Sequence, residues 1–209
     1  MNLVLCTMFM FLIGEESAFG GWVSSYAVIN GIQSKEDATF YGSIFWITIT
    51  LFRFVFLILP GKPSTRSLAM YIGSIFIAVT SILFLHVWPQ LGNEWILYSS
   101  IGFGIFFSIV FPLLLSTPKQ FEINLRPSDN SNFMIAASLG EGTIAVFTGY
   151  CMDWFGADML FYSILGVNIV ILVGHFVLIN KLNEEHLEFE CNQCQKVSEI
   201  EIVSQDLND

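Results

Sequence analysis

Two adjacent carboxylates interrupt a long apolar run close to the start of the chain. Glu15 and Glu16 lie in the middle of residues 3–29, which are otherwise rich in leucine, phenylalanine, methionine and valine. A charge at the centre of a bilayer costs about 2.5–3.5 kcal/mol, whereas one leucine or phenylalanine offsets only about 0.3–0.6 kcal/mol. Charged side chains in such a segment therefore face a bundle interior or a wet cavity, where they bind solutes or carry ions.

Arg53 and Glu141 lie at comparable depths in two further apolar runs. A buried arginine beside one of the carboxylates would offset much of the cost of burial, whereas a carboxyl group left without a base takes up a proton more readily. With three acids and one arginine, at least two acids lack a basic partner within the runs. We therefore expect one acid to be protonated or ion-bound during a working cycle. Arg53 could instead extend its charged end to the membrane interface.

Aromatic side chains accompany the first carboxylate on a helical wheel. One stripe of the wheel carries Glu15, Phe19, Trp22 and Tyr26. Small residues on the opposite side would let a neighbouring helix approach closely. Tryptophan and tyrosine combine a flat apolar ring with a polar group, which suits a solute with apolar ring faces, such as a sugar. In the alternative interpretation, Trp22 and Tyr26 only mark the membrane–water boundary.

The elements that must position these residues are membrane helices. Of the 209 residues, 54% are hydrophobic and 12% are charged, and the mean hydropathy is +0.66; soluble domains carry about 25% charged residues. We therefore predict an all-α integral membrane protein with a six-transmembrane-helix bundle over residues 1–181. An acidic, mostly disordered tail is predicted over residues 182–209. The six apolar runs that could cross a bilayer are about 3–29, 38–60, 68–88, 95–116, 132–152 and 158–180.

Polar stripes recur in three of the other runs. In the fourth run, Ser108 shares a face with other small residues, and in the fifth, Glu141 is flanked by Gly140 and Gly142, which allow close helix packing. We predict that these faces line a pathway for solute and ions. The second run carries five residues on one face at helical spacing, namely Thr39, Ser43, Trp46, Thr50 and Arg53.

The distribution of charge predicts the orientation of the bundle. The net charge is −10, and the segment from residue 181 onward carries eight acids against two lysines, so the acidity argues against a nucleic-acid partner. The even-numbered connections and the tail hold six basic residues, whereas the odd-numbered connections hold one, Lys35. Because basic residues gather in cytoplasmic segments, both termini are predicted to be cytoplasmic.

No enzymatic constellation is recognisable in the sequence. It contains neither HExxH, nor GxSxG, nor paired His/Asp ligands, and six membrane spans leave no room for a globular catalytic domain. We therefore expect no enzymatic activity and no cofactor. Cys191 and Cys194 form a CNQC in the tail, but one CxxC without a second pair is weak evidence for zinc, so no metal site is predicted and the role of the pair stays open.

Four stretches follow one another along the chain: GEESAFGGWVSSYA, ATFYGSIFWITITLFRF, SIVFPLLLSTPKQF and AASLGEG. In this order they resemble the C-terminal half of a major facilitator superfamily transporter, in the branch of fucose permease-like and sodium-dependent glucose transporter-like proteins. The resemblance implies that Glu16 takes the place of the acid of the family's seventh helix. It likewise implies that Arg53 takes the place of the arginine of the eighth helix and Glu141 that of the acid of the eleventh.

The chain departs from the family pattern at two positions and in length. Glu15 stands where the family has a small residue, and Phe52 stands where it has glycine. The resemblance implies two six-helix halves around a midplane site, and only one half is present. We therefore expect a truncated product or fragment, or a half-transporter that assembles with a second six-helix half or as a homodimer.

The residues and the resemblance together predict a secondary active transporter, or half of one, that moves a small polar solute by alternating access. The solute is expected to be a sugar, with H⁺ or Na⁺ symport, across the lipid bilayer of the plasma membrane. The alternative is a truncated or degenerate membrane protein that does not transport and serves as a scaffold. The predicted pathway residues are Glu15, Glu16, Trp22, Tyr26, Trp46, Thr50, Arg53, Ser108 and Glu141.

Overall fold

The computed structural model describes residues 2–58, 63–86, 94–120 and 126–181. Within these residues the chain forms six helices and no strand, so the predicted all-helical fold is confirmed. The described part of each predicted apolar run falls on one helix. The predicted tail and its CNQC lie outside the described residues. The helices are α1 (Asn2–Ile29), α2 (Lys35–Ile58), α3 (Pro63–His86), α4 (Trp95–Gln120), α5 (Pro127–Phe155) and a last helix, Met159–Lys181.

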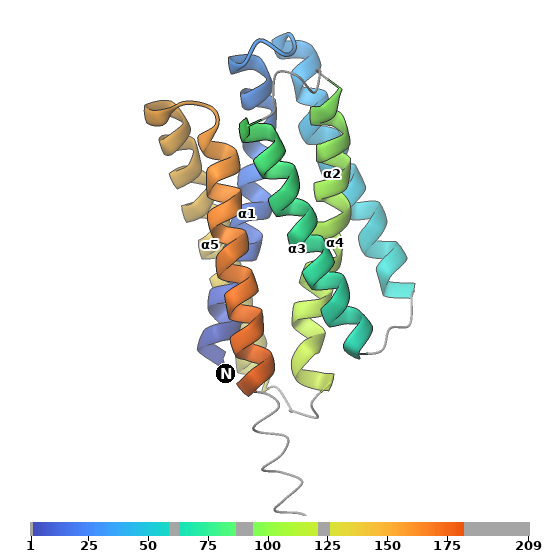
Figure 1. The fold of residues 1–209 in the computed structure, drawn as a ribbon. Coiled ribbons are helices and arrows are strands. Elements are labelled where there is room, and N and C mark those ends of the chain that lie inside the picture. Colours follow the sequence, from blue (N-terminus) through green and yellow to red (C-terminus); the bar gives the residue numbers. More distant parts are fainter. Residues whose placement is uncertain (1, 59–62, 87–93, 121–125, 182–209) are drawn as a thin grey trace, which may run out of the picture.

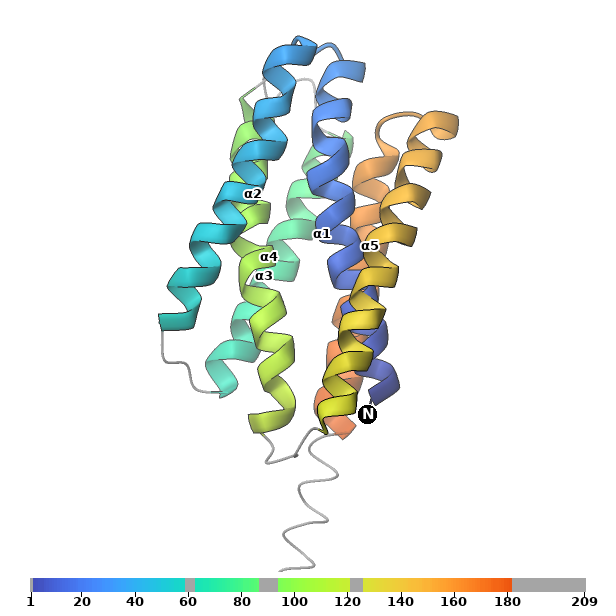
Figure 2. The same cartoon turned by 180° about the vertical axis from the view of Figure 1, so that it is seen from behind.

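Five of the described helices contain an apolar stretch that is long enough, by length and composition, to cross a membrane, and α3 contributes the shorter apolar stretch Tyr71–His86. A helix satisfies its own backbone hydrogen bonds, which is what a segment in hydrocarbon requires. The helices run side by side as an elongated bundle, with successive helices in opposite directions (Figures 1 and 2). The predicted orientation of the termini stays a prediction.

Local sequence signals set the helix boundaries. Gly31 (φ 66°) and Gly156 (φ 103°) lie just beyond α1 and α5, in backbone conformations that side chains with a Cβ rarely adopt. Before α2, the Ser34 hydroxyl donates to Asp37 Oδ2 (2.8 Å) and accepts from the Asp37 amide (3.2 Å). This contact gives a partner to one of the free N–H groups at the start of the helix.

Aromatic rings fill the centre of the bundle. Phe19 on α1 packs edge-on against Phe45 on α2 (4.9 Å between ring centroids) and Phe103 on α4 (4.8 Å). Towards the end of α1, Tyr26 packs edge-on against Phe161 of the last helix (4.9 Å), which stacks on Phe84 of α3 (4.4 Å). Through these rings α1 packs against α2, α4 and the last helix, and by way of the last helix it connects to α3. The aromatic packing of the bundle is therefore centred on α1.

Glycines bring α1 and α5 into backbone contact. A Cβ at Gly140 would lie 1.8 Å from the Met10 carbonyl oxygen, and one at Gly14 would lie 2.5 Å from the Ile144 side chain. The expectation that Gly140 allows close packing is confirmed. For Gly142 it is wrong, because nothing lies within 4 Å of the corresponding Cβ position. Gly142 is two positions along the helix from Gly140, a rotation of about 200° at about 100° per residue, so it lies on the side of α5 opposite the contact.

We predict that Gly140→Ala destabilises the bundle by about 1–3 kcal/mol, because the added methyl group meets backbone that cannot rotate away. Gly142→Ala is the matched control: it has open space and gains helix propensity, so stability should stay equal or rise slightly. Thermal unfolding of the two variants in detergent checks this, and equal midpoints for both would contradict the α1–α5 contact.

Candidate solute and ion pathway

An ion pair joins α1 to α2 inside the bundle. Arg53 Nη2 donates to both carboxylate oxygens of Glu16, at 2.7 Å each. The Glu16 side chain is 5% exposed and that of Arg53 is 35% exposed. The Arg53 guanidinium also lies 5.4 Å from the centre of the Phe111 ring on α4, a cation–π distance. The sequence pointed to a pairing of Arg53 with a carboxylate, and the structure brings it together with Glu16.

Glu15 lies beside this pair in the chain but has a different environment. Its side chain is 1% exposed, and neither carboxylate oxygen has a hydrogen-bond partner among the described residues. Burying an ionised carboxylate without a partner is far more costly than burying its protonated form. Glu15 is therefore a position at which a proton or another cation would relieve a large unfavourable energy.

Glu141 is not a member of the ion pair, although it lies close enough to Glu16 for the two carboxylates to repel each other. Its side chain is exposed on α5, whereas Glu15 and Glu16 are buried. The five polar-stripe residues of α2, Thr39 to Arg53, are also exposed or only partly buried. Among the described residues, no helix packs fully over the predicted pathway face of α2 or over Glu141 on α5.

Trp22, Tyr26 and Ser108 use their polar groups within the bundle. Trp22 Nε1 donates to the Ala145 carbonyl of α5 (2.7 Å), and the Tyr26 hydroxyl donates to Asp158 over a long 3.5 Å contact. Ser108 is fully buried and donates to the Ile105 carbonyl of its own helix. In this conformation these side chains hold helices in place, and their predicted role in solute contact stays a prediction.

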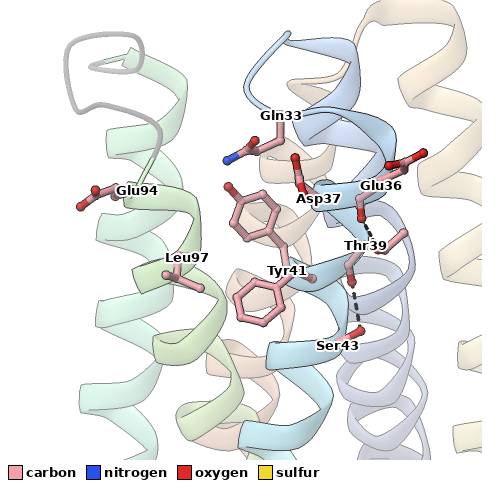
Figure 3. Close-up of a pocket in the computed structure, with 9 residues that line it drawn as sticks. Gln33, Glu36, Asp37, Thr39, Tyr41, Ser43, Glu94 and Leu97 are labelled. Carbon is pink, nitrogen blue, oxygen red and sulfur yellow. Dashed lines mark hydrogen bonds between the residues drawn. The ribbon is translucent and has the colours of Figure 1, made fainter.

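A second cluster of carboxylates surrounds a hollow of about 640 Å³ at one end of the bundle. The sequence analysis did not single out Glu36, Asp37 and Glu94, which line the hollow (Figure 3). Their spacing in sequence gives no sign of their proximity, since α3 separates them. Among the described residues, no group of three or more His, Cys, Asp or Glu side chains is arranged to hold a metal ion.

Comparison with curated proteins gives two matches of low identity. The human sodium-dependent glucose transporter 1 is 28% identical over 175 residues, which cover 80% of this chain and 32% of that protein. The major facilitator superfamily domain-containing protein 4A of Xenopus tropicalis is 26% identical over 154 residues, which cover 72% of this chain and 29% of that protein. The chain thus spans about a third of the length of these relatives.

These similarities confirm the resemblance to major facilitator superfamily transporters that the sequence motifs predicted. Together with the long apolar helices, they support a protein that crosses a membrane several times. No protein-family model and no solved structure match the chain.

We predict that Arg53→Met and Glu16→Gln each destabilise the bundle, because each leaves the other member of the pair without its partner in a poorly hydrated site. Since Arg53 is about a third exposed, the cost is expected below the 3–5 kcal/mol of a fully buried pair. The double variant should recover part of the loss. Chemical unfolding of the unmodified chain, the two single variants and the double variant forms a double-mutant cycle, which measures the coupling energy between Arg53 and Glu16. If the two losses of unfolding free energy simply add in the double variant, the pair contributes nothing.

Proposed function

We propose that the chain is one six-helix half of a major facilitator superfamily-type secondary transporter, which moves a small polar solute by alternating access. The observation that carries the proposal is the buried, unpartnered Glu15 beside the Glu16–Arg53 ion pair. Ionisable groups at this depth in apolar helices are retained where they serve binding or ion movement, because they cost stability otherwise.

The two adjacent carboxylates support different roles in such a cycle. Arg53 neutralises Glu16 and holds α1 against α2, so a change in the distance between these helices would break the pair and expose both charges. No base among the described residues neutralises Glu15, so we assign it the coupling ion, H⁺ or Na⁺. This assignment goes beyond the family resemblance, because the branch pattern has a small residue at the position of Glu15.

A sugar is the proposed solute, since one relative is named a glucose transporter. Trp22 and Tyr26 would supply ring faces and polar groups once helix movement frees them. Trp46 and Thr50, on the uncovered face of α2, and Glu141 on α5 would meet the solute or the covering partner. The cover we propose is a second six-helix half or a second copy of the chain, because a charge such as Glu141 is costly against lipid.

The alternative is a membrane protein that does not transport and serves as a scaffold. The observation that favours it is that Trp22, Tyr26 and Ser108 already use their polar groups inside the bundle. This alternative requires uptake to be absent from proteoliposomes even when a companion six-helix half is supplied.

We predict that proteoliposomes holding the chain, alone or with a companion half, accumulate labelled glucose when an inward H⁺ or Na⁺ gradient is imposed. Glu15→Gln should abolish gradient-driven accumulation while exchange of labelled for unlabelled glucose continues, because the neutral amide cannot carry the ion. Asp153→Asn, the same chemical change at an exposed site, is the control and should behave as the unmodified chain.

Uptake that stays unchanged in Glu15→Gln, Glu16→Gln and Glu141→Gln at normal expression would contradict a role for these carboxylates. Uptake that is absent in every reconstitution would favour the scaffold.

A further inference from the structure

Buried polar side chains form a seam between α1, α3 and the last helix. Asn168 on the last helix is 2% exposed, and its side-chain amide donates to the Ser74 carbonyl of α3 (2.8 Å). His175 lies two turns further along the same face of that helix and is also 2% exposed. Its ring lies edge-on against the ring of Tyr71 on α3, with 5.1 Å between the centroids. The last helix thus presents two buried polar side chains to α3.

Glu15 lies on the stripe of α1 that faces the last helix. Met8 and Tyr26 share this stripe with Glu15, and both contact the last helix. A Cβ at Gly174 would lie 2.9 Å from the Met8 side chain, and the Tyr26 ring packs edge-on against Phe161 (4.9 Å between centroids). Because the two helices run in opposite directions (Figure 1), the part of the last helix opposite Glu15 lies between these two contacts.

Two ionisable groups along this seam have buried atoms without a hydrogen-bond partner. Among the described residues, neither carboxylate oxygen of Glu15 and not Nδ1 of His175 has one. Asn168 lies on the stretch of the last helix between them and offers a polar side chain there. Leaving a buried polar atom unpaired costs about 1–3 kcal/mol, and apolar side chains would pack the helices without that cost. The unpaired atoms therefore point to a mobile partner, namely a proton and the water that carries it.

The seam is closed by rings at one end and reaches the surface at the other. At the closed end Tyr26 packs against Phe84 and Phe161, and the last two rings stack with 4.4 Å between their centroids. At the open end Tyr71 is only half-buried beside His175. This is the end at which α1 begins and the last helix finishes (Figures 1 and 2). The packing therefore favours entry of protons from that end.

The other titratable groups on these helices do not occupy the seam's unpaired positions. Glu16 is held by Arg53, and the Tyr26 hydroxyl donates to Asp158. No described charged side chain forms a hydrogen bond or ion pair with Glu15 or with Nδ1 of His175. The titratable residues among the described side chains of α1, α3, the last helix and the residue before it are Cys6, Glu15, Glu16, Tyr26, Tyr71, His86, Asp158, Tyr162, His175 and Lys181.

We propose that His175 relays protons between the open end of the seam and Glu15, so that H⁺ is the ion that Glu15 carries. An imidazole accepts a proton on one ring nitrogen and releases one from the other, which suits a proton shuttle. His175 takes a proton from water at the open end and passes it on to the Glu15 carboxylate, which becomes a neutral carboxyl group. Because two helical turns span about 10 Å, water bound at Asn168 completes the path.

The term coupling ion rests on the proposed transport, but the relay is measured without it, on the purified full chain in detergent. A jump from alkaline to acidic buffer is followed by the infrared absorption of protonated carboxyl groups. The part of the absorption that Glu15→Gln removes belongs to Glu15. His175→Gln should slow the appearance of this part about a hundredfold, the effect of removing a positioned proton-transfer group. Its final height should stay the same, because the route changes and the acceptor does not.

Chemical rescue separates a relay from a purely structural role. His175→Ala leaves space for added imidazole, which should restore the rate in proportion to its concentration, whereas lost packing would not respond. Asn168→Leu interrupts the path without altering the histidine and should also slow protonation. His86→Gln makes the same change at the exposed end of α3 and should leave the rate unchanged. Thermal unfolding midpoints near that of the unmodified chain show that each variant is folded.

The relay is overturned if Glu15→Gln removes no absorption, if His175→Gln protonates as fast as the unmodified chain, or if imidazole does not restore His175→Ala. An equal slowing in His86→Gln would also overturn it. If neither His175 variant folds, an unchanged rate in Asn168→Leu decides against the relay. Relay kinetics as expected, with no glucose uptake, would contradict the transport proposal alone. Gradient-driven uptake with unchanged kinetics in His175→Gln would contradict the relay alone.

Discussion

A carboxylate can remain charged inside an apolar bundle only when a cation lies against it. Arg53 meets this requirement for Glu16, with both carboxylate oxygens 2.7 Å from one guanidinium nitrogen. The pair joins α1 to α2, and the guanidinium also contacts a ring of α4. Three helices are therefore held at the depth where hydrocarbon would otherwise make a charge most costly.

The packing around α1 fixes the ion pair in place. On one side, glycines let the backbones of α1 and α5 touch, and Trp22 adds a hydrogen bond from its indole to α5. On another side, the ring of Phe19 lies between rings of α2 and α4. Interiors packed in this way shift between discrete arrangements rather than deforming continuously. Movement of α2 relative to α1 would thus open the ion pair as a single event.

Two groups of carboxylates lie at different depths and in different surroundings. Glu15 and Glu16 are enclosed by helices, where a change in protonation or ion occupancy has a large energetic effect because water does not screen it. Glu36, Asp37 and Glu94 lie around an open hollow at the end of the bundle, where their charges remain hydrated. The deep group is therefore suited to storing and releasing one charge.

The sequence by itself determined the number and type of elements, because apolar runs of membrane length with helical periodicity allow no other structure in lipid. It also raised the pairing of Arg53 with one of the carboxylates as one of two possibilities, the other being an arginine that extends to the membrane interface. It did not determine that Glu16 rather than Glu15 would be the partner, that Glu141 would be exposed, or that Glu94 would line the same hollow as Glu36.

Periodicity fixes the angles between side chains within one helix, about 100° per residue, but leaves the rotation of each helix against its neighbours free. Only tertiary packing, through the Gly140–Met10 contact and the Phe19 ring cluster, decides which of two adjacent glutamates meets the arginine.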